Sequence, residues 1–299
     1  MFIGIDIGGT SVKYGLVDSD ANILNVFEFK ARYINGDYTL LQDTIDGLDE
    51  FLREESIKLD NIEAIGISAT GQISDDGKVI GTAGHIPNWL GVDIKKEFED
   101  RYNKPVSVIN DANSMVVAEK RFGAAKGCKH VVGITIGTGV GGGIIVNNQL
   151  LTGADGIAGE VGHILINECD IIDNYNRAGS YEDAASTTVL VNAVKKLGYK
   201  NVDGKVIFNE LIKNDDVKIA YDKWLNNITR GLVSLIHIFN PEIIVIGGGV
   251  SVREEFISEL KSKVLHSVMP SFSKNLKFEA AKLGNNAGLL GAISSYIGE

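Results

Sequence analysis

The stretch FIGIDIGGTSVKYGLV, residues 2–17, decides the fold of this chain. An apolar run over 2–7 ends at Gly8 and Gly9, and a second apolar run follows over 12–17. This pattern predicts a buried strand, a tight turn and a returning strand. Glycine permits positive φ and close approach of a ligand, and successive backbone N–H groups in such a turn form an anion cradle. The opening of the chain therefore predicts a hairpin whose turn is suited to phosphate.

The same order returns in the second half of the chain. A strand is predicted over 130–136, a glycine turn over 137–141 and a second strand over 142–147. Because the order occurs twice, two related lobes are expected. The glycine spacing also matches a dinucleotide fingerprint, but that fingerprint needs a helix where a strand is predicted here, and the chain has no Gly-Lys-Ser/Thr of a P-loop. Two phosphate-type hairpins are favoured, with two ordinary tight turns as the alternative.

Strands and helices alternate along the rest of the chain. Further strands are predicted over 22–30, 62–68, 106–109 and 243–246. Helices are predicted over 40–55, 92–102, 112–122, 181–197, 216–239, 253–265 and 287–297, and residues 70–92 and 167–183 are expected to be loops. The alternation predicts an α/β fold, and a length of 299 residues suggests about two domains.

Composition excludes several classes of function. The formal net charge of −10 disfavours nucleic acid and anionic membranes as partners. Cys128 and Cys169 make neither a disulfide framework nor a CxxC metal site. The N-terminus lacks the pattern of a signal peptide, and no apolar run of about 20 residues could span a bilayer. A cytoplasmic protein with no nucleic acid or membrane partner is expected.

Asn110 and Asp111 end the apolar strand predicted at 106–109, just before a predicted helix. Ligands bind at the carboxyl ends of strands in α/β sheets. A carboxylate there could take the proton of a substrate hydroxyl, as the base does in phosphoryl transfer. Asp and Asn are also common helix N-caps, so the segment alone leaves a base and a cap as alternatives.

Two more segments carry polar chemistry or glycines. The GEVGH segment at 159–163 holds Glu160 and His163, and Glu182 follows it. Two carboxylates and a histidine suit the hydroxyls of a polyol, and a solvated loop with a hydrogen-bonded histidine is the alternative. A predicted strand also runs into three glycines at 247–249, which suits a nucleoside pocket or a tight strand–helix turn.

These segments occur together, in one order, along the whole chain. They are DIGGT at 6–10, IPNW at 86–89, NDAN at 110–113, GTGVGGG at 137–143, GEVGH at 159–163 and IGGGV at 246–250. In this order they resemble the ROK family (repressors, open reading frames, kinases). The resemblance implies an α/β, two-lobed actin-like ATPase (ribonuclease H-like) fold with the active site in the interdomain cleft. It also implies a smaller N-terminal lobe over 1–113 plus 287–299 and a larger C-terminal lobe over 114–286.

The resemblance implies a role for each matching residue. Asp111 is expected to be the catalytic base. The expected sugar ligands are Gly71, Asn88, Asn110, Asp111, Glu160, His163 and Glu182, with Gln72 and the 85–89 loop at the acceptor end. The expected ATP-binding residues are Asp6, Gly8, Gly9, Thr10, Gly137, Thr138, Gly139, Gly248 and Gly249, with Asp6 near the Mg²⁺ of Mg-ATP. A homodimer is implied by the resemblance alone.

One departure from the family pattern concerns zinc. Many members bind zinc through the histidine of the GExGH motif and three cysteines that follow it. An ungapped alignment from His163 puts Asp173, Tyr175 and Ser180 at those cysteine positions, and Cys169 lies outside the pattern. One histidine and one aspartate do not make a sulfur-rich tetrahedral site. No structural zinc is therefore expected, and the contacts of the residues around this loop are expected to depend on apolar packing instead.

The resemblance implies an ATP-dependent kinase that phosphorylates a sugar hydroxyl, most simply the 6-OH of a hexose. The motifs fit kinases of glucose, fructose, mannose, N-acetylmannosamine and β-glucosides alike. A DNA-binding regulator of the family would carry a helix-turn-helix ahead of the first strand, which is predicted to begin here at Phe2. A non-catalytic sugar-binding regulator is the other alternative, and the presence of Asp111 and both glycine turns favours the kinase.

Overall fold

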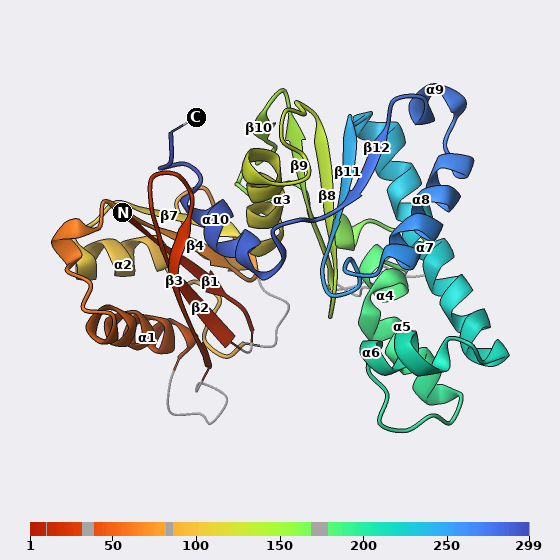
Figure 1. Ribbon diagram of the computed structural model, residues 1–299, viewed down its shortest axis with the longest axis horizontal. Helices are drawn as coiled ribbons and strands as arrows, with labels where there is room; N and C mark the ends of the chain where they lie inside the picture. The colour runs from red at the N-terminus through yellow and green to blue at the C-terminus, as the bar shows by residue number, and fades with distance from the viewer. Residues whose placement is uncertain (10, 32–38, 82–85, 169–178, 299) are drawn as a thin grey trace. The chain divides into compact units, whose positions relative to one another are not determined.

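The computed structural model describes residues 1–9, 11–31, 39–81, 86–168 and 179–298 (Figure 1). The chain forms two compact units. Unit 1 comprises Met1–Phe122, Leu151–Ala158 and Asn285–Glu299, and unit 2 comprises Gly123–Leu150 and Gly159–Gly284. Each unit has a five-stranded sheet of its own.

The sheet of unit 1 has the strand order β3-β2-β1-β4-β7. Its strands are β1 (Phe2–Ile7), β2 (Ser11–Val17), β3 (Ile23–Lys30), β4 (Ala64–Ala69) and β7 (Val106–Asn110). The first three strands are antiparallel neighbours, whereas β1, β4 and β7 run parallel. The hairpin predicted over 2–17 is confirmed, with Ile7 opposite Val12 beside the turn.

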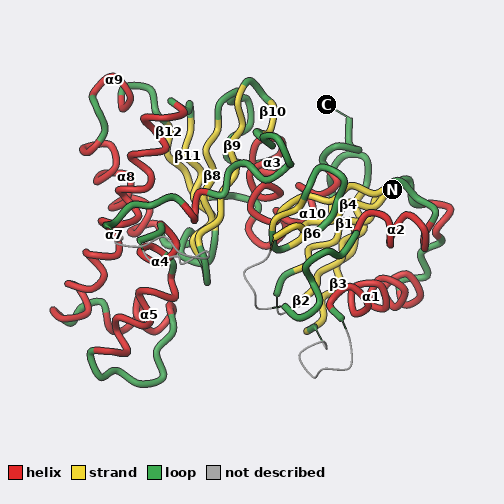
Figure 2. The backbone as a smooth tube through the Cα atoms, turned by 180° about the vertical axis from the view of Figure 1, so that it is seen from behind, coloured by secondary structure: helices red, strands yellow, loops and turns green. Residues whose placement is uncertain are grey.

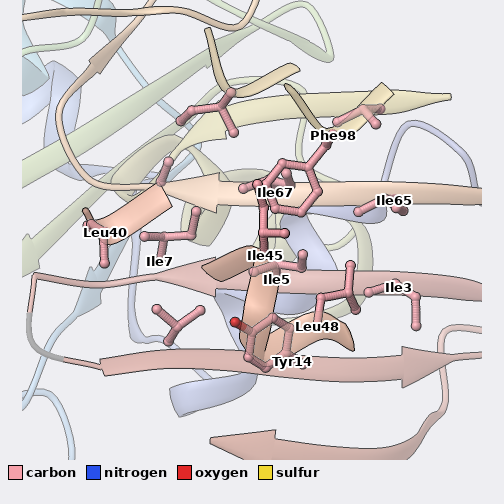
Figure 3. Close-up of a cluster of buried hydrophobic side chains, with 14 of the residues drawn as sticks. Ile3, Ile5, Ile7, Tyr14, Leu40, Ile45, Leu48, Ile65, Ile67 and Phe98 are labelled. Carbon is pink, nitrogen blue, oxygen red and sulfur yellow. The ribbon is translucent and has the colours of Figure 1, made fainter. Parts of the chain in front are cut away.

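One face of this sheet carries the core of unit 1. Successive side chains of a strand point to opposite faces, so the three isoleucines of β1 lie on the same face. They pack with Leu48 and Phe98, which come from α1 (Leu40–Glu54) and α2 (Ile94–Tyr102) (Figure 3). Full burial of such a side chain contributes about 1.5–3 kcal/mol, so this face supplies much of the stability of unit 1.

The opposite face is covered at backbone distance by α10 (Ala287–Ile293). A Cβ added to Gly4 would lie 2.8 Å from the Leu289 carbonyl oxygen, and one added to Gly66 would lie 2.3 Å from the Ala292 carbonyl oxygen. Real Cβ atoms essentially never approach within 3.0 Å of such an atom. The glycines of β1 and β4 are therefore needed because a helix packs directly on the strand backbone.

We expect Gly66→Ala to lower the free energy of unfolding by about 2 kcal/mol, because overpacking of a core typically costs roughly 1–3 kcal/mol. Urea unfolding followed by circular dichroism measures this change. Gly298→Ala is the matched control, because no described residue other than its chain neighbour has an atom within 4 Å of the Cβ position of Gly298. Equal stability of the two variants would contradict the close packing of α10 on β4.

The sheet of unit 2 repeats the arrangement of the sheet of unit 1. Its strands are β8 (Val131–Ile136), β9 (Val140–Val146), β10 (Gln149–Leu150), β11 (Ile243–Gly247) and β12 (Lys277–Ala280). Their order is β10-β9-β8-β11-β12 (Figure 2). Strands β8, β11 and β12 are parallel, and β8, β9 and β10 are antiparallel neighbours. The two sheets thus share strand order and directions, which confirms the internal repeat predicted from the two glycine hairpins.

The longest helix of the described chain, α7 (Asp215–Phe239), packs against β8 and against α8 (Glu254–Ser267), which in turn packs against β12. Two shorter helices, α4 (Tyr181–Ala185) and α5 (Thr187–Lys196), also pack on α7. The other helical segments are α3 (Asp111–Phe122), α6 (Gly204–Val206), α9 (Pro270–Ser273), a π-helix at Ile207–Leu211 and 3₁₀ turns at Leu59–Asn61, Val161–His163 and Gly284–Asn286. In the described parts of the chain, none of the helices combines the length and apolar character that a bilayer crossing needs.

Two predicted helices are wrong in extent. The single helix predicted over 181–197 is interrupted at Ser186, which has an extended ψ of 155°. The Trp224 indole N–H donates to the Ala185 carbonyl at 2.8 Å and to the Ser186 carbonyl at 2.9 Å, so these groups bond to a side chain at the break. The helix predicted over 287–297 ends at Ile293, and the Arg121 guanidinium bonds to backbone carbonyls of the segment that follows.

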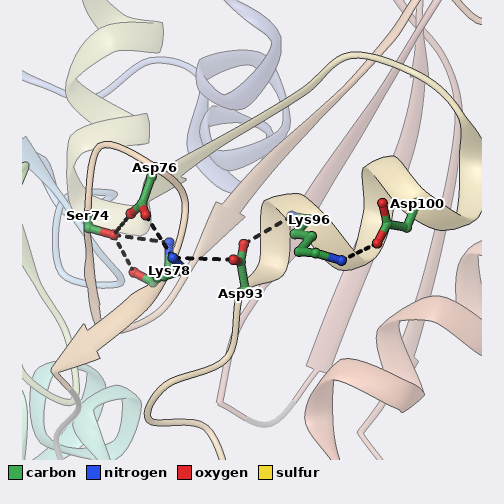
Figure 4. A network of polar contacts seen from close by, with 6 residues as sticks. All are labelled: Ser74, Asp76, Lys78, Asp93, Lys96 and Asp100. Atoms are coloured by element: carbon green, nitrogen blue, oxygen red, sulfur yellow. Dashed lines mark hydrogen bonds and ion pairs between the residues drawn. The ribbon is translucent and has the colours of Figure 1, made fainter.

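The region 70–92, predicted as loop, contains the short hairpin β5 (Gln72–Ile73) and β6 (Val79–Gly81). A network of hydrogen bonds and ion pairs joins the turn of this hairpin to the start of α2 (Figure 4). The Lys78 Nζ lies 3.0 Å from an Asp76 carboxylate oxygen and 3.5 Å from one of Asp93. Exposed ion pairs of this kind contribute little to stability. Strands this short give too few residues for a periodic sequence signal.

Candidate active site

The candidate residues of unit 1 lie at the edge of its sheet where β1, β4 and β7 end. Ile7, Ala69 and Asn110 pair in register across the three parallel strands. The Thr70 N–H then donates to the Ile7 carbonyl at 3.1 Å. The segments that follow the three strands therefore leave the sheet side by side. Ligands of α/β sheets bind at this edge.

The first glycine turn is closed by backbone contacts. The Gly8 N–H donates to the Ser11 carbonyl at 3.0 Å, and a Cβ on Gly8 would lie 3.2 Å from the same oxygen. Among the described residues that do not adjoin Gly9 in the chain, the nearest heavy atom to a Cβ on Gly9 would be the δ carbon of Ile86, at 4.0 Å. Neither glycine has φ in the left-handed region, so close approach to the Ser11 carbonyl, and not a positive φ, accounts for Gly8.

Asp6 lies on the face of β1 that α10 covers. Its Oδ1 accepts a hydrogen bond of 2.7 Å from the hydroxyl of Ser68, which is fully buried. A Cβ on Gly288 of α10 would lie 2.3 Å from the Asp6 carboxyl carbon, so this carboxyl group requires glycine at 288. Burial raises the pKa of Asp6 above its ordinary value of 3.8, and the Ser68 hydrogen bond and the charge of Lys13 offset this only in part.

The surroundings of Asp6 fit a magnesium ion that arrives with a nucleotide. Mg²⁺ prefers oxygen ligands, and at phosphate-transfer sites it uses one or two carboxylates together with substrate phosphates and waters. Asp6 supplies one carboxylate two residues before a glycine turn. Among the described residues, no group of three or more His, Cys, Asp and Glu side chains is placed to hold a metal ion. A site of the nucleotide-dependent kind does not need such a group.

Asn110 and Asp111 have different contacts, which bears on the two roles considered for this segment. The Asn110 Oδ1 accepts hydrogen bonds from the N–H groups of Ala112 at 2.9 Å and Asn113 at 3.1 Å, so Asn110 caps helix α3. Its amide donates to the Gly71 carbonyl at 2.9 Å. Asp111 is exposed at the first helical position, and its Oδ1 accepts from the Ala112 N–H at 2.8 Å. Asn110 thus accepts two of the N–H groups at the start of α3, and Asp111 is an exposed residue at the first position of this helix.

Gly71 and the IPNW segment lie together in unit 1. The Trp89 indole N–H donates to the Thr70 carbonyl at 2.9 Å, and Trp89 is only 1% exposed. Gly71 has a φ of +102°, and a Cβ there would lie 2.9 Å from the Gly81 carbonyl oxygen. Asn88, next to the buried indole, is exposed with a φ of +55°. The structure thus brings the segment of Asn88 beside Gly71, which Asn110 also contacts.

The glycines of unit 2 gather where β8 and β11 end. Thr135 pairs with Gly247 in register, so the turn after β8 and the glycines after β11 leave the sheet as neighbours. Gly248 has a φ of +87°, and a Cβ there would lie 2.2 Å from the Ile136 carbonyl oxygen. Apart from its neighbours in the chain, no described residue has an atom within 4 Å of the Cβ position of Gly249. The expected phosphate turn and the expected nucleoside glycines are therefore adjacent in this unit.

The GEVGH segment packs against the second glycine turn. A Cβ on Gly162 would lie 2.0 Å from the Val140 carbonyl oxygen, so glycine is needed for this contact. Glu160 and His163 lie together, with 3.7 Å between Oε2 and Nε2, and both side chains are partly exposed. Two polar side chains at such an exposed position suit the hydroxyl groups of a sugar.

Glu182 reaches the same glycine turn. Its Oε2 accepts a 3.0 Å hydrogen bond from the Val140 N–H. A Cβ on Gly139 would lie 2.2 Å from that oxygen, so the carboxylate lies directly against Gly139. The sequence predicted Glu182 only as a sugar ligand. Its contact with the turn joins residues 42 positions apart, which no local pattern signals.

Some predicted residues lie outside the described residues. These are Thr10 of the first turn, His85 of the acceptor loop, and Cys169, Asp173 and Tyr175 of the zinc comparison. Ser180, the third residue aligned with a zinc cysteine, caps α4, because its hydroxyl accepts from the Asp183 N–H at 3.2 Å.

The structure therefore assembles the predicted residues into one group in each unit. The group of unit 1 is Asp6, Gly8, Gly9, Gly71, Asn88, Asn110 and Asp111. The group of unit 2 is Gly137, Thr138, Gly139, Glu160, His163, Glu182, Gly248 and Gly249. Ser68 and Gly288, which surround Asp6, and Thr188, which contacts Thr138, were not predicted from the sequence.

Known proteins resemble the chain over nearly its whole length. The glucokinase of Thermotoga maritima is 34% identical over 311 aligned residues, which cover 98% of this chain and 96% of that protein. The xylose repressor of Bacillus subtilis is 27% identical, with 99% of this chain and 76% of the repressor covered. A crystal structure of a ROK family glucokinase from Streptomyces griseus in complex with glucose and AMPPNP matches with a TM-score of 0.81 at 29% identity, covering 98% of each chain.

These similarities extend over both units and agree with the repeated sheet topology. The fold is the α/β actin-like ATPase fold of ROK sugar kinases. A sequence model of the ROK family matches residues 2–297. The chain therefore belongs to the ROK family.

Proposed function

We propose that the protein is an ATP-dependent kinase of a small sugar. It transfers the γ-phosphoryl group to a hydroxyl of a hexose or hexose derivative, the 6-OH. The observation that carries the proposal is the exposed Asp111 carboxylate at the carboxyl end of β7, on a helix capped by its neighbour Asn110. The similarity to a glucokinase crystallised with glucose and AMPPNP supports the same two classes of substrate here.

Each group of residues has a distinct task in this proposal. Asp111 orients the accepting hydroxyl and takes its proton as the new bond to phosphorus forms. The backbone N–H groups of the glycine turns at 8–9 and 137–139 hold phosphate oxygens. Glu160 and His163 bind sugar hydroxyls, and the glycines at 248–249 border the nucleoside. Magnesium bound with ATP neutralises charge on the phosphates, and Asp6 is the residue that would hold it.

A coupled assay of ADP release over a panel of sugars tests the proposal. The panel holds glucose, fructose, mannose, N-acetylmannosamine and a β-glucoside, each with Mg-ATP. We expect at least one of them to stimulate ADP release well above the sugar-free rate, because binding of the sugar is what favours transfer over hydrolysis. A folded protein that releases no ADP with any sugar would contradict the kinase.

A non-catalytic sugar-binding regulator is the second candidate. The similarity to a xylose repressor over 99% of this chain favours it. Isothermal titration with the same sugars separates the two functions. A regulator would bind a sugar without consuming ATP, whereas the kinase would do both.

A further inference from the structure

The glycine turn of unit 2, residues 137–140, is held by a segment that follows it far along the chain. The Val140 N–H donates to the Glu182 carboxylate at 3.0 Å. The carboxylate lies directly against Gly139, where a Cβ would come within 2.2 Å of Oε2. A charged acceptor makes a stronger hydrogen bond than a neutral one, so this contact fixes one end of the turn.

Two threonines fix the other end of the turn. The Thr188 hydroxyl donates to the Thr138 carbonyl at 2.8 Å. The Thr187 backbone N–H donates to the Gly137 carbonyl at 2.9 Å. The two contacts differ in kind, because the first uses a side chain and the second only the backbone.

The holding segment, residues 182–188, is itself anchored. The Trp224 indole N–H and the Asn227 amide, both from α7, donate to the carbonyls of Ala185 and Ala184 at 2.8 and 3.0 Å. Trp224 is 2% exposed and Asn227 is 8% exposed, so both bonds are shielded from water. Side chains of α7 thus hold the segment, and the segment in turn contacts the glycine turn.

We propose that Glu182 and Thr188 are positioning residues for nucleotide phosphates, acting through the glycine turn at 137–140. Two of the four residues of this turn are glycines, and a glycine-rich turn loses much conformational entropy when a ligand orders it. Contacts that order the turn in advance remove that cost from binding. This inference rests on the proposed use of ATP. Under this inference Glu182 positions the turn that holds the phosphates, in addition to the sugar contact expected from the sequence.

Titration of the full chain with AMPPNP and MgCl₂, without sugar, tests the inference. We expect Thr188→Val to weaken AMPPNP binding about fivefold, the usual effect of one lost hydrogen bond. Thr188→Ser keeps the hydroxyl and should restore the affinity of the wild-type protein. Thr187→Val is the matched control, because the contact of Thr187 with the turn uses its backbone N–H.

Glu182 is tested by a graded pair of variants. Glu182→Gln keeps an oxygen acceptor without charge and should weaken AMPPNP binding about threefold. Glu182→Ala should weaken it about tenfold, since charge-assisted bonds are roughly twice as strong as neutral ones.

In the kinase reaction, Thr188→Val should raise the KM for ATP and leave the KM for the sugar unchanged. Circular dichroism confirms folding of each variant, and Glu182→Gln is decisive if Glu182→Ala does not fold.

Two outcomes would overturn the inference, and they differ in cause. If Thr188→Val and Glu182→Gln both bind AMPPNP as tightly as the wild-type protein does, neither side chain positions the turn. Wild-type protein that does not bind AMPPNP at all would remove the proposed use of ATP, and the inference with it.

Discussion

Asp111→Asn should lower turnover by about 10²-fold or more, because general-base catalysis typically contributes a factor of that size. Sugar binding should be spared, since the amide still offers an oxygen to a substrate hydroxyl. The fold should also be kept. The amide oxygen can accept the Ala112 N–H that the carboxylate accepts now at 2.8 Å, and Asn110 continues to cap the helix. The turnover number comes from coupled ADP release, and the sugar Kd from calorimetry.

Asp100→Asn is the matched control for this variant. Asp100 is an exposed carboxylate of the same unit that pairs with Lys96 one helical turn away. Exposed pairs of this kind contribute about 0–1 kcal/mol to stability, so the control should keep both fold and turnover. Near-normal turnover of Asp111→Asn would reject Asp111 as the base.

Asp6→Asn should lower the activity of the protein and raise its stability. We expect turnover to fall by about 10²-fold or more, because a metal ion held near the phosphates supplies several kcal/mol of charge stabilisation. The free energy of unfolding at pH 7 should rise instead, since the substitution removes a buried charge and Ser68 can still donate to the amide oxygen. Urea unfolding and ADP release measure the two effects on one preparation. Reduced stability together with unchanged turnover would contradict both assignments.

The pH dependence of stability gives the same residue a second test. Burial raises the pKa of Asp6 in the folded protein above 3.8, the ordinary value. Between these two pKa values the folded state binds more protons than the unfolded state, so the free energy of unfolding falls as pH rises through that window. Asp6→Asn should lose this contribution. As the pH rises from about 4, just above the ordinary pKa of 3.8, the free energy of unfolding of the variant should fall less than that of the wild-type protein.

Ser68→Ala provides the complementary change. Ser68 donates to the ionised Asp6 carboxylate, so its removal should raise the pKa of Asp6 further. If ionised Asp6 is needed for activity, the acidic limb of the kcat/KM profile should move to higher pH in Ser68→Ala. An unmoved limb, with unchanged Mg²⁺ dependence, would place Asp6 outside the reaction.

Local pattern was enough for much of the fold. The apolar runs on either side of Gly8–Gly9 predict β1 and β2, and the same order predicts β8 and β9. Such hairpins depend on residues close in the sequence, so their pattern is legible there. The break at Ser186 was not legible, because it accompanies hydrogen bonds from Trp224, almost forty residues away, to the carbonyls of Ala185 and Ser186.

The roles within the NDAN segment were also beyond local pattern. Asn and Asp both suit a helix cap, and the sequence leaves the two residues equivalent. The Asn110 side chain is fixed by its bond to the Gly71 carbonyl, which comes from another strand end. This tertiary contact directs Asn110 to the cap and leaves the Asp111 carboxylate exposed.

The opening stretch and its repeat by themselves determined the two β-hairpins, their glycine turns and the order of motifs, because these depend on the spacing of neighbouring residues. Only the tertiary structure decided why particular glycines are needed. Gly288 makes room for the Asp6 carboxyl group, and Gly66 makes room for the Ala292 carbonyl group of α10. Each pair is far apart in the sequence, and its contact exists only after separate strands and helices have packed together.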